Sequence, residues 1–239
     1  ATRTSTAGST HVAISVLTGN NHTITGNYIG GSTTSAGGTA WTIAGGFANR
    51  FIGIQIANGT TTASSIQGNF VRNISLSSTS GATTAPGVFC GIYINAAWAN
   101  VGTVTGNTIG AETGTGSISA TISTSLGLST GISIGGSSLG RVENNKIGSI
   151  TLAGSTTSVA HNFVGIEVAS FTASQTLTIN LNLIGSLTTA NSIRQSTAVT
   201  GTVSQGMTGI RIGSSNPVGV ITSNTIANLD NAAVSSGSS

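Results

Sequence analysis

The chain has 239 residues, a formal net charge of +3 and only 5% charged residues. Its seven Lys and Arg residues form no basic run, whereas nucleic-acid binding requires a clustered basic surface. No apolar run approaches the roughly 18 residues of a membrane-spanning helix. We therefore expect neither a nucleic-acid partner nor membrane insertion.

Gly, Ser, Thr, Asn and Ala dominate the composition, but the chain is not expected to be disordered. Disorder goes with low hydrophobicity and high net charge. Here 37% of the residues are hydrophobic, and Ile and Val recur periodically. The small residues are expected to serve turns and tight stacking.

In chain order, the first recurring element is a four-residue Gly-Ile-x-Ile pattern that predicts a β-strand. Alternation with period two places its two apolar side chains on one face. The copies are residues 53–56, 91–94, 131–134, 165–168 and 209–212, with 11–14 as a degenerate first copy. Stacking the copies puts Val12 beside Ile54 and Ile14 beside Ile56 in two inward columns. The same alignment places Ala13 beside Gln55 on the outward face.

The second recurring element follows each of these strands and is centred on an Asn. The Asn lies three residues after one β-branched residue and two before another, and the copies recur about every 40 residues, as in a stacked solenoid. The six residues are Asn27, Asn69, Asn107, Asn145, Asn182 and Asn224. Asn bonds local backbone in tight turns, and identical amides in register bond to the copies above and below. We interpret the six as a structural ladder at one corner of the coil, not as catalytic residues.

The apolar neighbours of each Asn predict two further core columns. One column is Ile24, Ile66, Val104, Val142, Ile179 and Ile221, and the other is Ile29, Val71, Ile109, Ile147, Ile184 and Ile226. A partial aromatic stack is expected from Phe51, Phe89, Phe163 and Met207. On the outward face, Glu167 and Arg211 would lie on adjacent coils and form an exposed ion pair worth well under ~1 kcal/mol.

Together these patterns predict an all-β fold, a parallel β-solenoid of about six coils of roughly 40 residues. Residues 1–239 would form one elongated domain, with coils ~4.8 Å apart and a rod of roughly 29 Å. The first coil begins almost at once, and residues 232–239 show no capping pattern. We therefore expect a segment of a longer repeat array whose partners are adjacent coils, either of the same chain or of stacked identical subunits.

Cysteine and histidine offer no site at the level of sequence. Cys90 is alone, so it forms no intrachain disulfide, and we expect a buried structural thiol. His11, His22 and His161 are far apart along the chain, and a metal site needs three or four convergent ligands. We expect isolated surface or turn histidines, with no metal and no cofactor.

The acidic residues argue against catalysis. Glycoside hydrolysis needs two carboxylates facing one cleft, whereas Glu112, Glu143, Glu167 and Asp230 fall in different coils at different positions. We therefore expect a protein that is not an enzyme. A carbohydrate-binding or polysaccharide-processing β-helix is the alternative. An ice-binding solenoid is a third, although Arg141 and Glu143 would interrupt the regular threonine array that it needs.

Aromatic side chains are the candidates for contacts with a ligand. Trp41, Trp98, Tyr28 and Tyr93 could provide stacking platforms for surface glycans. They do not fall in one column, and Trp41 and Trp98 could equally pack loops onto the body.

Two groups of residues carry a resemblance to known proteins. Residues 104–110 and 142–148 resemble repeats of right-handed parallel β-helices of the pectate-lyase-like superfamily. Residues 182–193 with 209–212 resemble very large, repetitive, secreted or cell-surface proteins of the Bacteroidetes type, usually regarded as adhesin-like. The resemblance implies a right-handed coil, a bacterial extracellular or cell-surface location, and a non-catalytic role as a stalk or filament segment.

Overall fold

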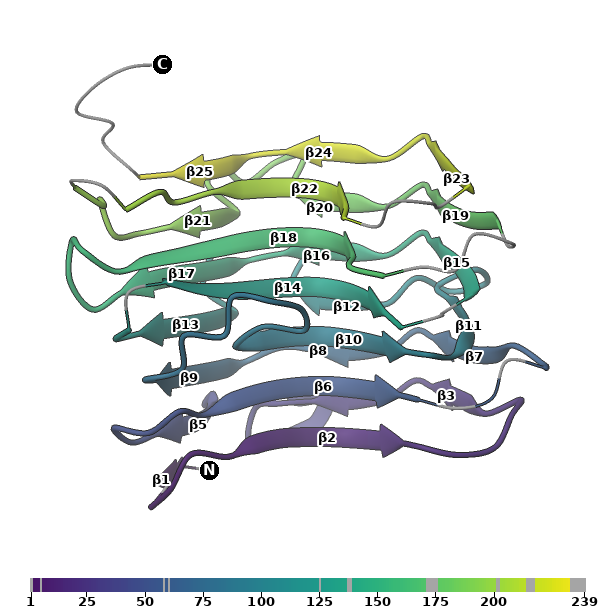
Figure 1. Ribbon diagram of the computed structural model, residues 1–239, viewed down its shortest axis with the longest axis horizontal. Helices are drawn as coiled ribbons and strands as arrows, with labels where there is room; N and C mark the ends of the chain where they lie inside the picture. The colour runs from purple at the N-terminus through teal and green to yellow at the C-terminus, as the bar shows by residue number, and fades with distance from the viewer. Residues whose placement is uncertain are drawn as a thin grey trace.

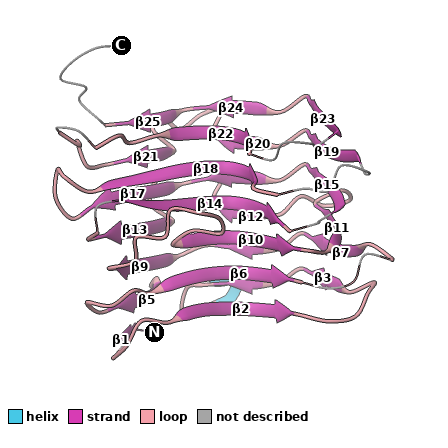
Figure 2. Cartoon of the chain, in the orientation of Figure 1, coloured by secondary structure: helices cyan, strands magenta, loops and turns pink. Residues whose placement is uncertain are grey.

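The repeated apolar alternation produces short strands that pair in parallel with their copies one coil away (Figure 1). In this computed structural model the described residues are 2–4, 6–57, 59, 61–124, 126–136, 139–170, 176–200, 203–213 and 218–232. They form an all-β parallel solenoid of about five coils of some 40 residues, with four sheets around a common axis (Figure 2). The chain passes six times through each of sheets B, C and D, and six passes delimit five complete coils, so six motif copies correspond to about five coils.

The four sheets take their strands in turn from each coil. Sheet A contains β1 (Thr2–Thr4), β5 (Trp41–Ala44), β9 (Ile74–Ser78), β13 (Ile118–Ile122), β17 (Ile150–Gly154), β21 (Ile193–Gln195) and β25 (Leu229–Asn231). Sheet B contains β2 (Thr10–Val16), β6 (Arg50–Ile56), β10 (Phe89–Asn95), β14 (Leu126–Gly135), β18 (Ala160–Val168) and β22 (Met207–Ile212).

The other two sheets flank the Asn corner. Sheet C contains β3 (Thr23–Thr25), β7 (Ser64–Gln67), β11 (Trp98–Val101), β15 (Leu139–Glu143), β19 (Thr176–Asn180) and β23 (Val218–Thr222). Sheet D contains β4 (Tyr28–Ile29), β8 (Phe70–Val71), β12 (Thr108–Gly110), β16 (Lys146–Gly148), β20 (Leu183–Gly185) and β24 (Thr225–Ala227). A 3₁₀ turn, η1 (Thr34–Ala36), follows β4. Within the described residues, no helix has the length and apolar character to cross a membrane.

The coil is right-handed and wider than it is tall. In Figure 1 the front strands of sheet B run to the right and the rear strands run to the left while the chain climbs from the N-terminus. The longest dimension lies across the coil, along the strands. The seven strands of sheet A are separated by six spacings of ~4.8 Å, which give a height of roughly 29 Å along the coil axis, as expected. The expected elongation along that axis is wrong for these residues, because each coil is broader than the stack of coils is tall.

The register of sheet B is confirmed from the second coil onward and is wrong in the first. Ile92 pairs with Ile54 and Ile132, as expected. In the first coil, however, Ile14 rather than Val12 pairs with Ile54. The strand β2 alternates along its whole length, so a shift by two residues keeps the same side chains inward. The observed register places the small Ala13, rather than His11, at the level of the glycine column.

The expected core position of Val104 is also wrong. Val104 is 86% exposed, and Val101 takes its place by pairing with Ile66 and Val142. Residues 102–106 form an excursion that carries extra residues out of the coil before the chain returns at Asn107. The prediction placed the core residue three positions before Asn107. The excursion lengthens this interval while Asn107 stays in register, so Val101 and not Val104 takes the core position.

A continuous apolar core runs through the coils. Phe51 and Phe89 stack with ring centroids 5.9 Å apart, and Met207 lies beside Phe163 in register. Ser129 lies in register between Phe89 and Phe163, so the aromatic stack is partial, as expected. Each fully buried Ile or Phe contributes about 1.5–3 kcal/mol through removal of apolar surface from water.

A column of glycines allows sheets B and D to approach each other. A Cβ on Gly131 would lie 2.6 Å from the carbonyl oxygen of Gly165 and 2.8 Å from Cδ1 of Ile147. The nearest atom belongs to the backbone of the adjacent strand, so the contact cannot be relieved by a rotamer change. The glycine of the Gly-Ile-x-Ile pattern is therefore a packing requirement.

We predict that Gly131→Ala lowers the free energy of unfolding by about 1–3 kcal/mol, because the added methyl group overpacks the interior. Gly46→Ala is the matched control, since a Cβ at Gly46 meets no atom within 4 Å. Chemical denaturation of the two variants measures the difference. Equal stability of the two variants would contradict the packing role.

Candidate functional site

The six asparagines form an unbroken chain of amide hydrogen bonds. The backbone N–H and the Nδ2 of Asn69 both donate to Oδ1 of Asn107, at 3.0 and 2.9 Å. The same pair of bonds joins each of the other neighbours, from Asn27 to Asn69 through to Asn182 to Asn224. Each amide oxygen from Asn69 onward thus accepts two hydrogen bonds from the preceding coil.

The amide nitrogens complete the ladder. Nδ2 of Asn107 also donates to the carbonyl oxygen of Ile66 in the preceding coil, at 2.9 Å. Corresponding bonds are made by Asn69, Asn145, Asn182 and Asn224. The four middle asparagines are at most 1% exposed. Their amides therefore have no polar atom available for a ligand, and their role in this geometry is to satisfy buried backbone groups.

The four acidic side chains each pair with a base. Glu167 and Arg211 lie in register on adjacent strands, and the carboxylate accepts a hydrogen bond of 2.6 Å from Nε of the arginine. This pair was expected to be exposed, but the Glu167 side chain is only 6% exposed, since the strand on each side covers it. The other pairs are Arg141–Glu143, Lys146–Glu112 and Arg194–Asp230. Each of the four carboxylates thus has a basic partner of its own.

The histidines are more buried than the sequence suggested. His161 was expected on the surface or in a turn but is fully buried, in register with Gly127 on β14. Its Nε2 lies 2.8 Å from Oγ of Ser129. Burial lowers the pKa of His161 to about 4, and hydrogen bonding to Ala153 opposes that shift only in part.

The other histidines lie in the first coil. His11 is 8% exposed, between Oγ of Ser9 and the guanidinium of Arg3. Burial and the adjacent Arg3 lower its pKa. His22 contacts the carbonyl oxygen of Thr18. Over the described ranges, no three His, Cys, Asp or Glu residues converge as metal ligands.

Cys90 is the expected buried thiol. It is fully buried, and Sγ donates to the carbonyl oxygen of Ile92 at 3.3 Å. Burial raises the pKa of the Cys90 thiol to about 12, so the reactive thiolate is not formed near neutral pH.

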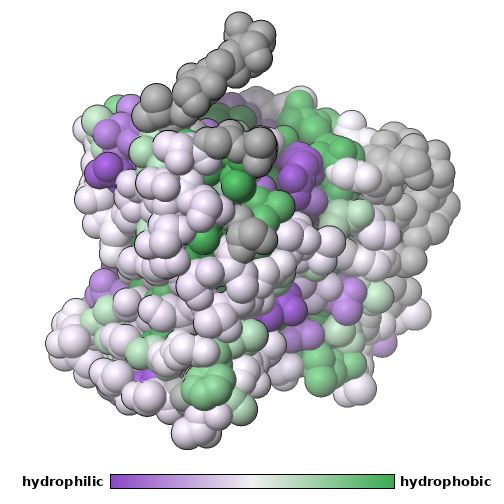
Figure 3. Space-filling view, turned by 60° about the vertical axis from the view of Figure 1, so that its left-hand side comes forward, coloured by the Kyte–Doolittle hydropathy of each residue, from purple (hydrophilic) through white to green (hydrophobic). Residues whose placement is uncertain are grey.

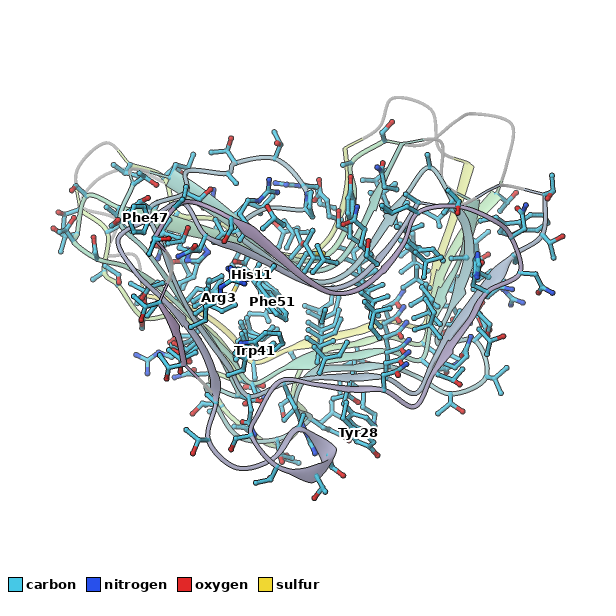
Figure 4. The ribbon with its side chains drawn as sticks, turned by 90° about the horizontal axis from the view of Figure 1, so that it is seen from below. Arg3, His11, Tyr28, Trp41, Phe47 and Phe51 are labelled. Atoms are coloured by element: carbon cyan, nitrogen blue, oxygen red, sulfur yellow. The ribbon has the colours of Figure 1, made fainter. Side chains whose placement is uncertain are left out.

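The four predicted aromatic contacts do not form one site. Trp41 points into the open end of the coil and packs edge-on against Phe51, whereas Tyr28 points outward (Figure 4). Tyr93 is half-buried in sheet B, and Trp98 is partly buried at the start of β11. Trp41 and Tyr28 line an open hollow of about 500 Å³ at the first coil. This hollow is the uncovered end of the solenoid.

A second hollow lies on the side of the solenoid and was not predicted. It measures about 480 Å³ and is lined by Phe70, Arg72, Thr105, Gly106, Thr108, Ala111, Glu112, Thr113, Asn144 and Lys146. We call it the lateral groove. Sequence reasoning missed its residues because they come from three coils. The signal in the sequence was the apolar Val101, which precedes Asn107 by more than the usual spacing and marks an excursion at the groove.

Comparisons with known proteins identify no relative. A scan against protein-family models, a search of curated proteins and a search of solved structures each found no match.

We predict that Asn107→Ala lowers the free energy of unfolding by about 2–4 kcal/mol, because the buried backbone N–H of Asn69 loses its acceptor and Asn145 and Ile66 each lose one donor. Asn27→Ala is the control, with an expected loss below about 1 kcal/mol, since Oδ1 of Asn27 accepts no bond from the described residues. Urea denaturation measures both variants. Similar losses would show that ladder bonds do not determine the stability.

We predict that His161 makes stability depend on pH. Its folded-state pKa lies below the ordinary value of 6.5, so the unfolded chain binds the proton more readily. This contribution is fully present above about pH 6.5 and is lost as the pH falls to about 4, a change on the order of 3 kcal/mol. Thermal melts across this range should show a smaller slope for His161→Gln than for wild type. His22→Gln, at a partly exposed position, is the control, and equal slopes in all three proteins would exclude the effect.

Proposed function

We propose that this chain is a non-catalytic structural segment of a stalk or filament in an extracellular or cell-surface adhesin-like protein of bacteria. The main support is that the ladder has a direction and that its two ends are complementary. Among the described residues, Oδ1 of Asn27 receives no donor, while the backbone N–H of Asn224 has no acceptor. One end thus offers an acceptor where the other offers a donor.

Apolar residues are also accessible at both ends of the solenoid, where they could pack against each other. In the last coil Ile221 and Ile226 are 48% and 49% exposed, although their counterparts in the middle coils are buried. At the first coil the end hollow is lined by apolar residues such as Ile29 and Trp41. Another coil of the same kind would cover either end and continue all four sheets, whether it belongs to the same chain or to an identical subunit.

The sides of the molecule suit a spacer. The space-filling view shows a face that is mostly neither strongly hydrophobic nor strongly hydrophilic (Figure 3). Two of the ion pairs, Glu167–Arg211 and Asp230–Arg194, join strands that are adjacent in a sheet. These contacts would tie successive coils of a longer array together. The mechanical role would follow from hydrogen-bond ladders and a continuous core rather than from a reactive group. The likeness of residues 182–193 and 209–212 to repetitive surface proteins supports the location.

We predict that the chain associates end to end as its concentration rises in the micromolar range. Sedimentation velocity should reveal species larger than the monomer, and electron microscopy should show rods lengthened along the coil axis. Ile226→Asp should abolish association, because it places a charge on the exposed end of the core. Val104→Asp, at an exposed position on the excursion, is the matched control and should associate like wild type. A monomer at every concentration, or equal association of both variants, would contradict the proposal for the ends.

A further inference from the structure

The lateral groove is located where a small residue interrupts a column of large ones. Along the outward face of sheet D, Thr108 pairs with Phe70 in the coil before and with Lys146 in the coil after. The short threonine side chain leaves the space between the aromatic ring and the lysine unfilled. The resulting hollow of about 480 Å³ falls within the range of roughly 300–1,000 Å³ that is typical of small-ligand sites.

One wall of the groove is the excursion of residues 102–106, and a buried amide holds this wall in place. Oε1 of Gln67 accepts hydrogen bonds from the backbone N–H groups of Val104 and Thr105, at 3.0 and 3.2 Å. Nε2 of Gln67 donates to the carbonyl oxygen of Asn100 and to Oγ1 of Thr103. Gln67 is only 7% exposed. Gln67 therefore anchors the excursion to the body of the solenoid at three points, Thr103, Val104 and Thr105.

The opposite wall follows β12 and carries charge. Glu112 accepts a hydrogen bond from Nζ of Lys146 at 2.5 Å, and the two side chains are 52% and 43% exposed. The backbone N–H of Gly114, just beyond this wall, donates to Oγ1 of Thr189 at 3.0 Å. The wall thus presents an accessible carboxylate and an accessible ammonium group side by side.

The end of the groove at the second coil is an aromatic cluster. Phe70 stacks on Tyr28, with centroids 5.0 Å apart and ring planes 8° from parallel. The Arg72 guanidinium lies 5.3 Å from the centre of the Phe70 ring, and its Nε donates to the carbonyl oxygen of Ser35 at 3.1 Å. These contacts fix both the ring and the cation before any ligand binds.

We propose that the lateral groove binds a neutral saccharide. Sugar hydroxyls both donate and accept, which suits a site with Lys146 and Arg72 as donors, Glu112 as acceptor and Asn144 as both. The C–H face of a pyranose ring would pack against Phe70. The mixture of charges argues against a simple ion, because Glu112 would repel an anion and the two bases would repel a cation.

The groove is independent of the proposed stalk. It is built from the side of coils two to four, whereas stacking uses the two ends. A stalk with such a site would hold a glycan along its flank. The site would also remain if the ends proved not to associate, so the two proposals fail separately.

The test measures binding of defined hexasaccharides to the whole chain by isothermal titration calorimetry. The neutral probes are β-linked hexamers of glucose, mannose and xylose, and the acidic probe is a hexamer of galacturonate. Wild type is expected to bind at least one neutral probe. Thr108→Phe fills the groove and should weaken that binding at least about tenfold. Thr225→Phe makes the same change in the same column outside the groove, and its affinity should equal that of wild type.

A second variant keeps the test valid if Thr108→Phe does not fold. Glu112→Gln alters an exposed side chain and keeps its shape, and it should weaken binding severalfold because the acceptor charge is lost. The proposal is overturned if wild type binds no neutral probe or only galacturonate. It is equally overturned if the folded groove variant binds as well as wild type.

Discussion

The structure depends on one repeated interaction, the hydrogen bond from one asparagine to the amide oxygen of the next. At this corner the backbone turns sharply inside the protein, where an unpaired N–H or C=O group would be costly. The ladder satisfies those groups with side chains instead of water. Because each amide must lie directly beside the next, the ladder also fixes the register of successive coils at this point.

Because the ladder fixes the register at the Asn corner, differences in the length of the coils must be accommodated in other parts of each coil. Successive asparagines are separated by 42, 38, 38, 37 and 42 residues, yet every pair makes the same bonds. The differences in length must be absorbed by the loops and by the excursion before Asn107. Regular columns therefore provide a scaffold suited to a spacer, and the irregular third coil builds the lateral groove. The same constraint underlies both proposals.

The sequence predicted the columns well where any other register would have placed a large side chain at a position that only a small residue can occupy. It failed where another register fitted the pattern equally well. From the second coil onward, the glycine and isoleucine positions left one register for sheet B. In β2 the alternation is uniform, so a shift of the strand by two residues was equally consistent with the pattern. The register was decided by the limited space at the glycine column, where Ala13 lies instead of His11. Val104 failed for a related reason, since spacing from Asn107 cannot reveal that the chain leaves the coil and returns. The burial of His161 and Glu167 depends on neighbours one coil away.

By itself the sequence determined the all-β solenoid, its repeat of about 40 residues and the identity of the ladder, because periodic apolar and Asn positions are local properties of the chain. Only the tertiary structure decided the breadth of the coil, the burial of Glu167 and the existence of the lateral groove. Those features join residues that lie one or two coils apart in the chain. Their contacts depend on how stacked coils align, and on which small side chain leaves space between larger neighbours.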